Sequence, residues 1–159
     1  MVESIKGLLD EWLYGRETLK WFIEKLSDDD IDKQLSRKTL NTIRKQCEEL
    51  LGIQAAYVKA LETGLMSFGD FKGENVLGNT PKEKLLIRIE ELDSLLSNIL
   101  EEYTGDEKIE WFGKKTIIHS HLAAMISHES MHIGQIIAFC YATNIKIPKE
   151  IANKMVLTG

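Results

Sequence analysis

The sequence is short of proline and has no long apolar run. Its two prolines are Pro81 and Pro148, so most of the chain lacks the residue that interrupts helices. A membrane-spanning helix needs about 20 consecutive apolar residues, and no run here approaches that length. Residues 1–21 carry acidic side chains and lack the apolar core of a signal peptide. We therefore expect a cytoplasmic protein with no membrane partner.

Disulfide frameworks and excess positive charge are also missing. The two cysteines, Cys47 and Cys140, are far apart in the sequence, which argues against a disulfide framework and fits a reducing cytoplasm. The 25 acidic residues outnumber the 20 basic ones, and the net charge is −5. Because no basic stripe is present to neutralise phosphates, the sequence predicts no nucleic-acid partner.

What the chain does contain is helical periodicity. Apolar residues recur at spacings of three and four along residues 3–26, 39–62, 80–103 and 115–143. Each segment carries one apolar stripe, as helices that share a core do, and no segment shows the alternation of a strand. A hydrophobic content of 43% is enough for a core, and the length favours one domain. We therefore predict an all-α fold in which residues 1–159 form a single four-helix bundle.

The connection between the second and third predicted helices carries recognisable signals. Gly64 is typical of a helix stop. Thr80-Pro81, followed by Glu83, is typical of a helix start, with threonine as the cap and proline in the first turn. The segment between them, residues 65–79, contains three glycines. It is either a plain crossover loop or a functional lid.

An acidic run in residues 28–32 resembles the start of a calcium loop. Asp28, Asp30 and Asp32 have the required spacing, but Lys33 occupies the position at which such loops need glycine. We therefore interpret the run as a solvated turn.

The most distinctive motif is His128-Glu129-Ser130-Met131-His132, which matches the H-E-x-x-H pattern of zinc proteases. Residues four apart in a helix lie on one face, about one turn apart. The two imidazoles can therefore hold one ion at ~2.0–2.1 Å. Glu129 is rotated by roughly 100° from His128, which directs it either toward a metal-bound water or toward solvent.

The rest of a zinc protease is missing. After His132 the chain has no further histidine and one acidic residue, Glu150. The longer motif with a third histidine fails, because Gly134 comes one position early and Cys140 is no matching ligand. No predicted strand could hold an extended peptide. Two alternatives remain: a metal or active site of another kind, and ordinary core histidines, each of which needs a polar partner.

The segment HESMHIGQI, residues 128–136, resembles the last helix of proteins in the DinB/YfiT-like superfamily. Residues 111–113 and 53–61 also resemble segments of that family. The match in length, helix order and motif placement covers essentially the whole chain. The resemblance implies a four-helix bundle with a long crossover loop between the second and third helices. It also implies a homodimer and a divalent metal held by three histidines.

The resemblance assigns two metal ligands on the last helix, His128 and His132. The third ligand of the family lies on the second helix, at the position of Glu49, eight residues before Tyr57. Three alternatives follow from this departure. Glu49 replaces the histidine, giving a two-histidine, one-carboxylate set that suits Zn, Ni, Fe or Mn; Cys47 is the ligand and favours zinc; or the metal has been lost. Cys47 belongs to an apolar stripe, which favours a core position.

The remaining histidines and the aromatic pair have structural interpretations. His121 precedes His128 by seven residues, a rise of about 10.5 Å that prevents both from binding one ion. We therefore expect His121 to line the bundle and His119 to lie at the surface. Trp111 and Phe112 are expected to cover one end of the bundle.

Two functions from different classes are compatible with these patterns. The resemblance implies a metal-dependent enzyme, and some relatives use such a site to activate a low-molecular-weight thiol for transfer or isomerisation of a small-molecule substrate. The competing interpretation is a non-catalytic dimeric bundle with a vestigial metal site, such as a protein of a stress response. The sequence assigns no catalytic residue in either case.

Overall fold

The computed structural model describes residues 1–69 and 76–157 and is mainly helical. Its long helices are α1 (Glu3–Lys25), α3 (Ile43–Thr63), α4 (Lys82–Glu101) and α5 (Ile118–Thr143). Two short helices, α2 (Asp28–Ile31) and α6 (Lys149–Lys154), lie at connections. The expectation of a mainly helical chain is thus confirmed. Whether the 65–79 segment is a lid depends partly on residues 70–75, which lie outside the described residues.

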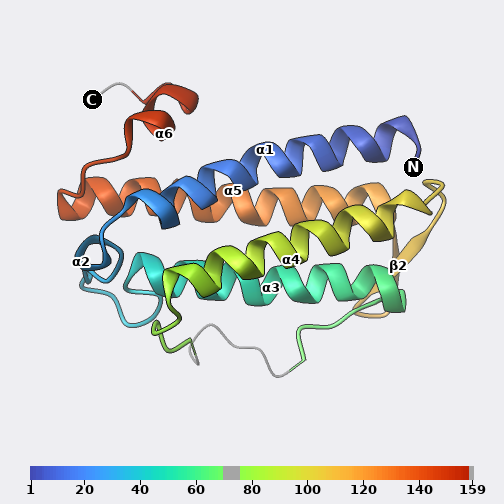
Figure 1. Cartoon of the computed structure of the whole chain (residues 1–159). Helices are drawn as coiled ribbons and strands as arrows, with labels where there is room; N and C mark the ends of the chain where they lie inside the picture. The colour runs from blue at the N-terminus through green and yellow to red at the C-terminus, as the bar shows by residue number, and fades with distance from the viewer. Residues whose placement is uncertain (70–75, 158–159) are drawn as a thin grey trace.

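The four long helices lie lengthwise beside one another (Figure 1), and each contacts two others. Helix α1 packs on α4 and α5, and α3 packs on the same two helices from the other side. The predicted apolar stripes meet between them. Fully buried members of this core include Ile5, Leu19, Phe22, Ile43, Leu50, Ile89, Leu96, Ile136 and Phe139. Burial of these stripes is what holds helices of such mixed polarity in place.

The expectation that the chain has no strands was wrong. A small sheet contains β1 (Leu65–Met66), β2 (Lys108–Trp111) and β3 (Lys114–Ile117), with β2 in the middle. β1 pairs with β2 in parallel, and β2 pairs with β3 as an antiparallel hairpin. These strands are too short to show an alternating pattern, so periodicity could not reveal them.

The β2–β3 hairpin turns at Phe112 and Gly113, whose φ angles are +48° and +81°. Two positive φ angles at the centre of a two-residue turn match the right-handed twist of the paired strands. The periodicity predicted that the last long helix begins near Lys115. Because residues 114–117 pair with β2, helix α5 begins at Ile118 instead.

The helix ends agree with the predicted signals in part. Gly64 ends α3 in the left-handed conformation, with φ +71°, as expected. The start of α3 is at Ile43, because the Thr42 side chain accepts a hydrogen bond from the backbone N–H of Lys45 and so caps the helix there. The prediction of a threonine cap at Thr80 was wrong, since α4 begins after Pro81 without a side-chain cap.

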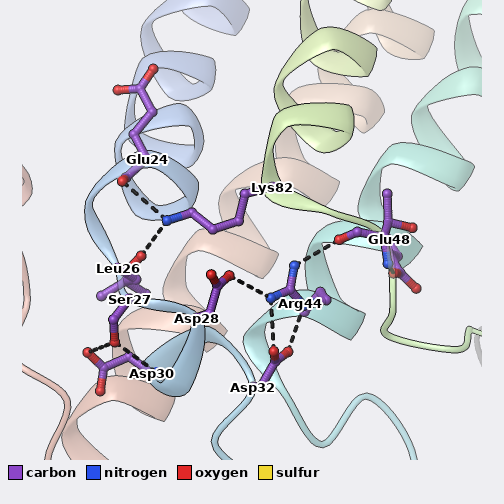
Figure 2. Close-up of polar contacts among 10 residues, drawn as sticks. Glu24, Leu26, Ser27, Asp28, Asp30, Asp32, Arg44, Glu48 and Lys82 are labelled. Atoms are coloured by element: carbon purple, nitrogen blue, oxygen red, sulfur yellow. Dashed lines mark hydrogen bonds and ion pairs between the residues drawn. The ribbon is translucent and has the colours of Figure 1, made fainter.

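Acidic residues at one end of the helices hold the crossover in place (Figure 2). Asp32 and Asp28 accept hydrogen bonds from the buried Arg44 guanidinium, with Nε–Oδ1 and Nη2–Oδ1 distances of 2.6 and 3.1 Å. Arg44 also donates to the carbonyl of Thr80, and the Glu48 carboxylate accepts from the Thr80 N–H. The acidic run is solvent-exposed, as interpreted, but it forms the short helix α2 rather than a plain turn, and two of its carboxylates also pair with an arginine.

No helix within residues 1–69 and 76–157 is long and apolar enough to cross a membrane.

Candidate metal centre

Glu49 on α3 lies against His128 and His132 on α5. Each of the three side chains offers one ligand atom, and these atoms all lie within 4.8 Å of one another. The two imidazole centroids are 4.7 Å apart, as the one-turn spacing predicts. The small sheet fixes this alignment: β1 follows the end of α3, and β3 leads directly into the start of α5. Counted in residues, Glu49 lies as far before the end of α3 as His132 lies after the start of α5, so the two side chains are at the same distance from the sheet.

The closest contact in the group joins His132 Nε2 and Glu49 Oε2, which are 2.9 Å apart. The His132 side chain is 3% exposed and that of Glu49 is 13% exposed. His128 is half-buried. The group therefore lies just beneath the surface, with its access on the His128 side.

Several polar atoms of the group have no hydrogen bond within the described chain. They are Nδ1 of His128, Nδ1 of His132 and Oε2 of Glu49, which has an ion-pair distance to His132 but not hydrogen-bond geometry. Buried polar atoms without partners are costly. Two imidazoles and one carboxylate form a ligand set that suits Zn, Ni, Fe(II) or Mn. The residues present therefore fit a divalent ion.

The electrostatics of His128 favour the form that binds metals. Its pKa is lowered, first by burial and then by the neighbouring His132, while Glu49 acts in the opposite direction. A lowered pKa keeps the imidazole neutral near physiological pH, and only the neutral imidazole is a metal ligand.

Cys47 is in the hydrophobic core and does not belong to this group. It is fully buried, and burial raises the pKa of its thiol to about 12. A metal binds the thiolate form, so this environment disfavours the alternative in which Cys47 replaces the missing histidine. The core position that its apolar stripe predicted is confirmed.

Glu129 faces neither solvent nor the His128–His132 pair. It is 2% exposed, and its Oε2 accepts hydrogen bonds from Arg16 Nη1 of α1 at 3.1 Å and from the Gln54 amide of α3. Burial is the main cause that raises the pKa of Glu129 to about 7, and nearby Asp93 acts in the same direction. The expectation that Glu129 would face solvent or a water on the metal was therefore wrong.

This buried polar network was not predicted from the sequence. Arg16 joins two carboxyl groups, because its Nε also donates to Asp93 Oδ1 at 2.8 Å. Arg16 is 1% exposed and Gln54 is fully buried. The available signal was the position of Arg16 four residues after Trp12, inside the apolar stripe of the first helix.

His121 is a buried structural residue, as its spacing predicted. Its Nε2 contacts the carbonyl of Tyr57 at 3.0 Å, and its Nδ1 accepts a hydrogen bond from Trp111 Nε1 at 3.0 Å. A carbonyl only accepts and an indole N–H only donates, so His121 is neutral with its proton on Nε2. Burial also lowers its pKa. His119 is partly exposed and contacts the hydroxyl of Ser4.

Aromatic rings form one wall of the candidate site. The Tyr57 ring centroid is 6.2 Å from that of His128 and 5.6 Å from that of Trp111. Trp111 therefore covers this end of the helices, as expected. Phe112 does not share that role, because it is 76% exposed and stacks on Phe68.

No protein-family model matches this chain, and no curated protein matches it. The resemblance to the DinB/YfiT-like superfamily therefore stays a prediction that depends on the motif residues.

Proposed function

We propose that the protein is a metal-dependent enzyme of the DinB/YfiT-like four-helix-bundle type, in which Glu49, His128 and His132 hold one divalent ion. The observation that carries this proposal is the convergence of the three ligand atoms, from two helices, within 4.8 Å. Their position just beneath the surface and the unpartnered atoms of the group support it. The departure from three histidines then becomes a two-histidine, one-carboxylate set.

The proposed substrate is a low-molecular-weight thiol, used for transfer or isomerisation. A divalent ion with open positions supplies Lewis acidity, which lowers the pKa of a thiol bound to it. The chain's own part is to present neutral imidazoles and to exclude bulk water on the inner side. Tyr57 keeps its proton at neutral pH, as an ordinary tyrosine does, and burial raises its pKa further. Its ring forms a wall beside His128.

Metal content of matched variants tests the site. Protein purified without a histidine tag and supplied with Zn, Ni, Mn or Fe(II) should bind about one equivalent, as a single three-ligand site does. His128→Ala should lose the metal, whereas His119→Ala, which changes a partly exposed histidine of the same helix, should keep it. Glu49→Ala should weaken binding, whereas Glu62→Ala on the exposed face of α3 should not.

The thiol chemistry needs its own assay. Metal-loaded protein should accelerate conjugation of a small thiol with an electrophile, and His128→Ala should not. A protein that binds metal yet is inactive toward a panel of thiols would contradict the substrate class but leave the metal site intact.

The second candidate is a non-catalytic dimeric bundle with a vestigial site. The observation that favours it is the 2.9 Å contact between Glu49 and His132, which can pair these groups without an ion. Failure of the wild-type protein to bind any of the four metals, together with a dimeric mass in light scattering, would favour this candidate over the enzyme.

A further inference from the structure

The aromatic ring at the tip of the β2–β3 hairpin contributes little to the fold. Phe112 is 76% exposed, so its ring adds little to the buried core. Its φ of +48° lies in the left-handed region, where a bulky side chain is strained and where two-residue turns favour asparagine or glycine. Stability alone therefore does not account for a phenylalanine here, and strained residues are typical of functional sites.

Phe112 forms a pair with a second phenylalanine. Its ring stacks on that of Phe68, with centroids 6.2 Å apart and an angle of 29° between the ring planes. Phe68 lies just after β1 and is half-buried. The pair therefore joins the hairpin to the segment that follows α3, and it presents aromatic surface to solvent at Phe112.

The Phe68–Phe112 pair is continuous with the candidate metal centre. The centroid of Phe68 is 6.4 Å from that of Tyr57, and the Tyr57 centroid is 6.2 Å from that of His128. A row of rings thus leads from the hairpin, at the end of the molecule where α3 ends and α5 begins (Figure 1), to a proposed metal ligand. The pair is connected to the His128 side of the site, which is its more exposed side.

The chemistry of this surface selects the kind of ligand. The faces of phenyl rings carry negative potential, so they stack best on a flat ring that is poor in electrons. Phe68 also lines a groove of about 480 Å³ together with Ala55, Ala56 and Leu65. Of the described lining residues of this groove, Lys59 carries the one charge. A cation there favours electronegative substituents on the ring.

We propose that Phe68 and Phe112 bind a flat, electron-poor aromatic compound. This inference rests on the proposed function for its role: the compound is the electrophile that is conjugated with the thiol. An electrophile that a thiol attacks is itself electron-poor, so the same property serves recognition by the two rings and reaction at the metal centre.

Titration with matched probes tests the ligand class. Nitrobenzene should shift the backbone amide NMR signals of Phe112 and Gly113 in a saturable way. Nitrocyclohexane carries the same nitro group on a saturated ring, and it should bind roughly three- to tenfold more weakly, as the loss of one aromatic stack predicts. Equal affinity of the two probes, or saturable shifts confined to other parts of the chain, would overturn the proposal.

Substitution at the hairpin tip tests the location. Phe112→Asn removes the ring but supplies a residue that this turn favours, so the midpoint of urea denaturation should not fall while nitrobenzene binding weakens by roughly threefold or more. Phe112→Tyr keeps a ring and should bind as the wild type does. Tyr141→Ala is the control, since Tyr141 is an exposed aromatic residue near the other end of α5, and it should leave binding unchanged. Undiminished affinity in Phe112→Asn would place the compound elsewhere and overturn the proposal.

The mass of the same proteins in light scattering tests whether the pair is instead a contact between two copies of the chain. The wild type and Phe112→Asn should have the same mass. Conversion of a dimer into a monomer by this substitution would assign the pair to a subunit interface and would overturn the proposal.

Two electrophiles connect the pair to the proposed reaction. When a thiol attacks 1-chloro-2,4-dinitrobenzene, a C–S bond forms as the C–Cl bond breaks, chloride leaves with the bonding electrons, and the thiol proton passes to water. Iodoacetamide reacts in the same way with loss of iodide but has no ring. In metal-loaded protein, Phe112→Asn should raise KM for the aromatic electrophile roughly threefold or more and leave the rate with iodoacetamide unchanged. Equal effects on both would contradict a role in recognising the ring.

Chelation separates this proposal from the proposed enzyme. Protein treated with a chelator should bind nitrobenzene as tightly as metal-loaded protein does, because neither phenylalanine is a metal ligand. Binding at the hairpin by a protein that takes up no metal would leave the aromatic site standing while the proposed enzyme fails. Activity toward iodoacetamide without saturable binding of nitrobenzene would leave the enzyme standing and overturn this proposal.

Discussion

Arg16 on α1 and Glu129 on α5 meet inside the hydrophobic core, with Nη1 of the guanidinium 3.1 Å from Oε2 of the carboxylate. Both side chains are almost completely buried. The pair joins two helices directly behind the candidate metal centre, because Glu129 is adjacent to His128 in sequence. Asp93 extends the contact to α4 and the amide of Gln54 extends it to α3. All four long helices therefore contribute to one polar cluster.

Arg16→Leu should destabilise the protein strongly. It leaves the buried Glu129 and the largely buried Asp93 without their cation, and breaking a buried ion pair from one side costs about 3–5 kcal/mol. Urea denaturation measures the change in the free energy of unfolding. Arg88→Ala is the control: Arg88 is half exposed and pairs with Glu91 on the surface, where the cost is about 0–1 kcal/mol. Similar effects for both variants would show that the buried network contributes little.

Stability should fall between about pH 4.5 and pH 7 because of Glu129. Burial raises its pKa from 4.5 to about 7 in the folded protein. A raised folded pKa means that the folded state holds this proton longer than the unfolded state. The stabilisation is therefore complete below the unfolded pKa and is lost as pH rises through the folded pKa. Each unit of difference corresponds to about 1.4 kcal/mol.

Glu129→Gln should remove that pH dependence while keeping an acceptor for Arg16. Unfolding free energies of the two proteins, measured by urea denaturation across this pH range, should diverge as pH rises, with the wild type losing more. Buried His121 and His128 act in the opposite direction, since their pKa values are lowered, but they are present in both proteins and cancel in the difference. Parallel curves would contradict the assigned shift.

The native cysteines should react slowly with a thiol reagent. Burial raises the pKa of Cys47 to about 12 and that of Cys140 to about 11, and the thiolate is the reactive form. Both thiols should react promptly in urea. Rapid reaction of one thiol in the folded protein, slowed by added zinc, would instead support Cys47 as a metal ligand.

Periodicity and motif spacing predicted the positions of the helices well but did not predict the buried polar contacts between them. The apolar stripes located α1, α3, α4 and α5, because helix burial follows a simple period. The i, i+4 histidines were also placed by spacing, whereas Glu49 was named only through the family resemblance, as one of three alternatives. The role of Glu129 was not, because a helix position gives a direction around the axis and not the identity of the partner helix that faces it. The partner of Arg16 could not be predicted either, because it depends on how α1 packs on α5.

The sheet and its turn were missed for a different reason. Strands of two to four residues carry no measurable alternation, and their pairing joins residues far apart in sequence, such as Leu65 and Glu110. The two-residue turn at Phe112-Gly113 was the local signal, but it was interpreted as part of an aromatic cap. Trp111 belongs both to the sheet and to the buried aromatic cluster: it is the last residue of β2, and its indole N–H donates to His121.

Trp111→Phe should therefore destabilise the protein by about 1–3 kcal/mol, because it leaves Nδ1 of the fully buried His121 without a donor. The phenyl ring keeps most of the packing against Tyr57, so the loss reports mainly the hydrogen bond. Phe112→Leu is the neighbouring control and should change stability by less than about 0.5 kcal/mol, since Phe112 is mostly exposed. Nitrogen-detected NMR of the His121 ring should show a proton on Nε2 in the wild type. If Nδ1 carries the proton instead, the indole cannot be its donor and the assigned contact is wrong.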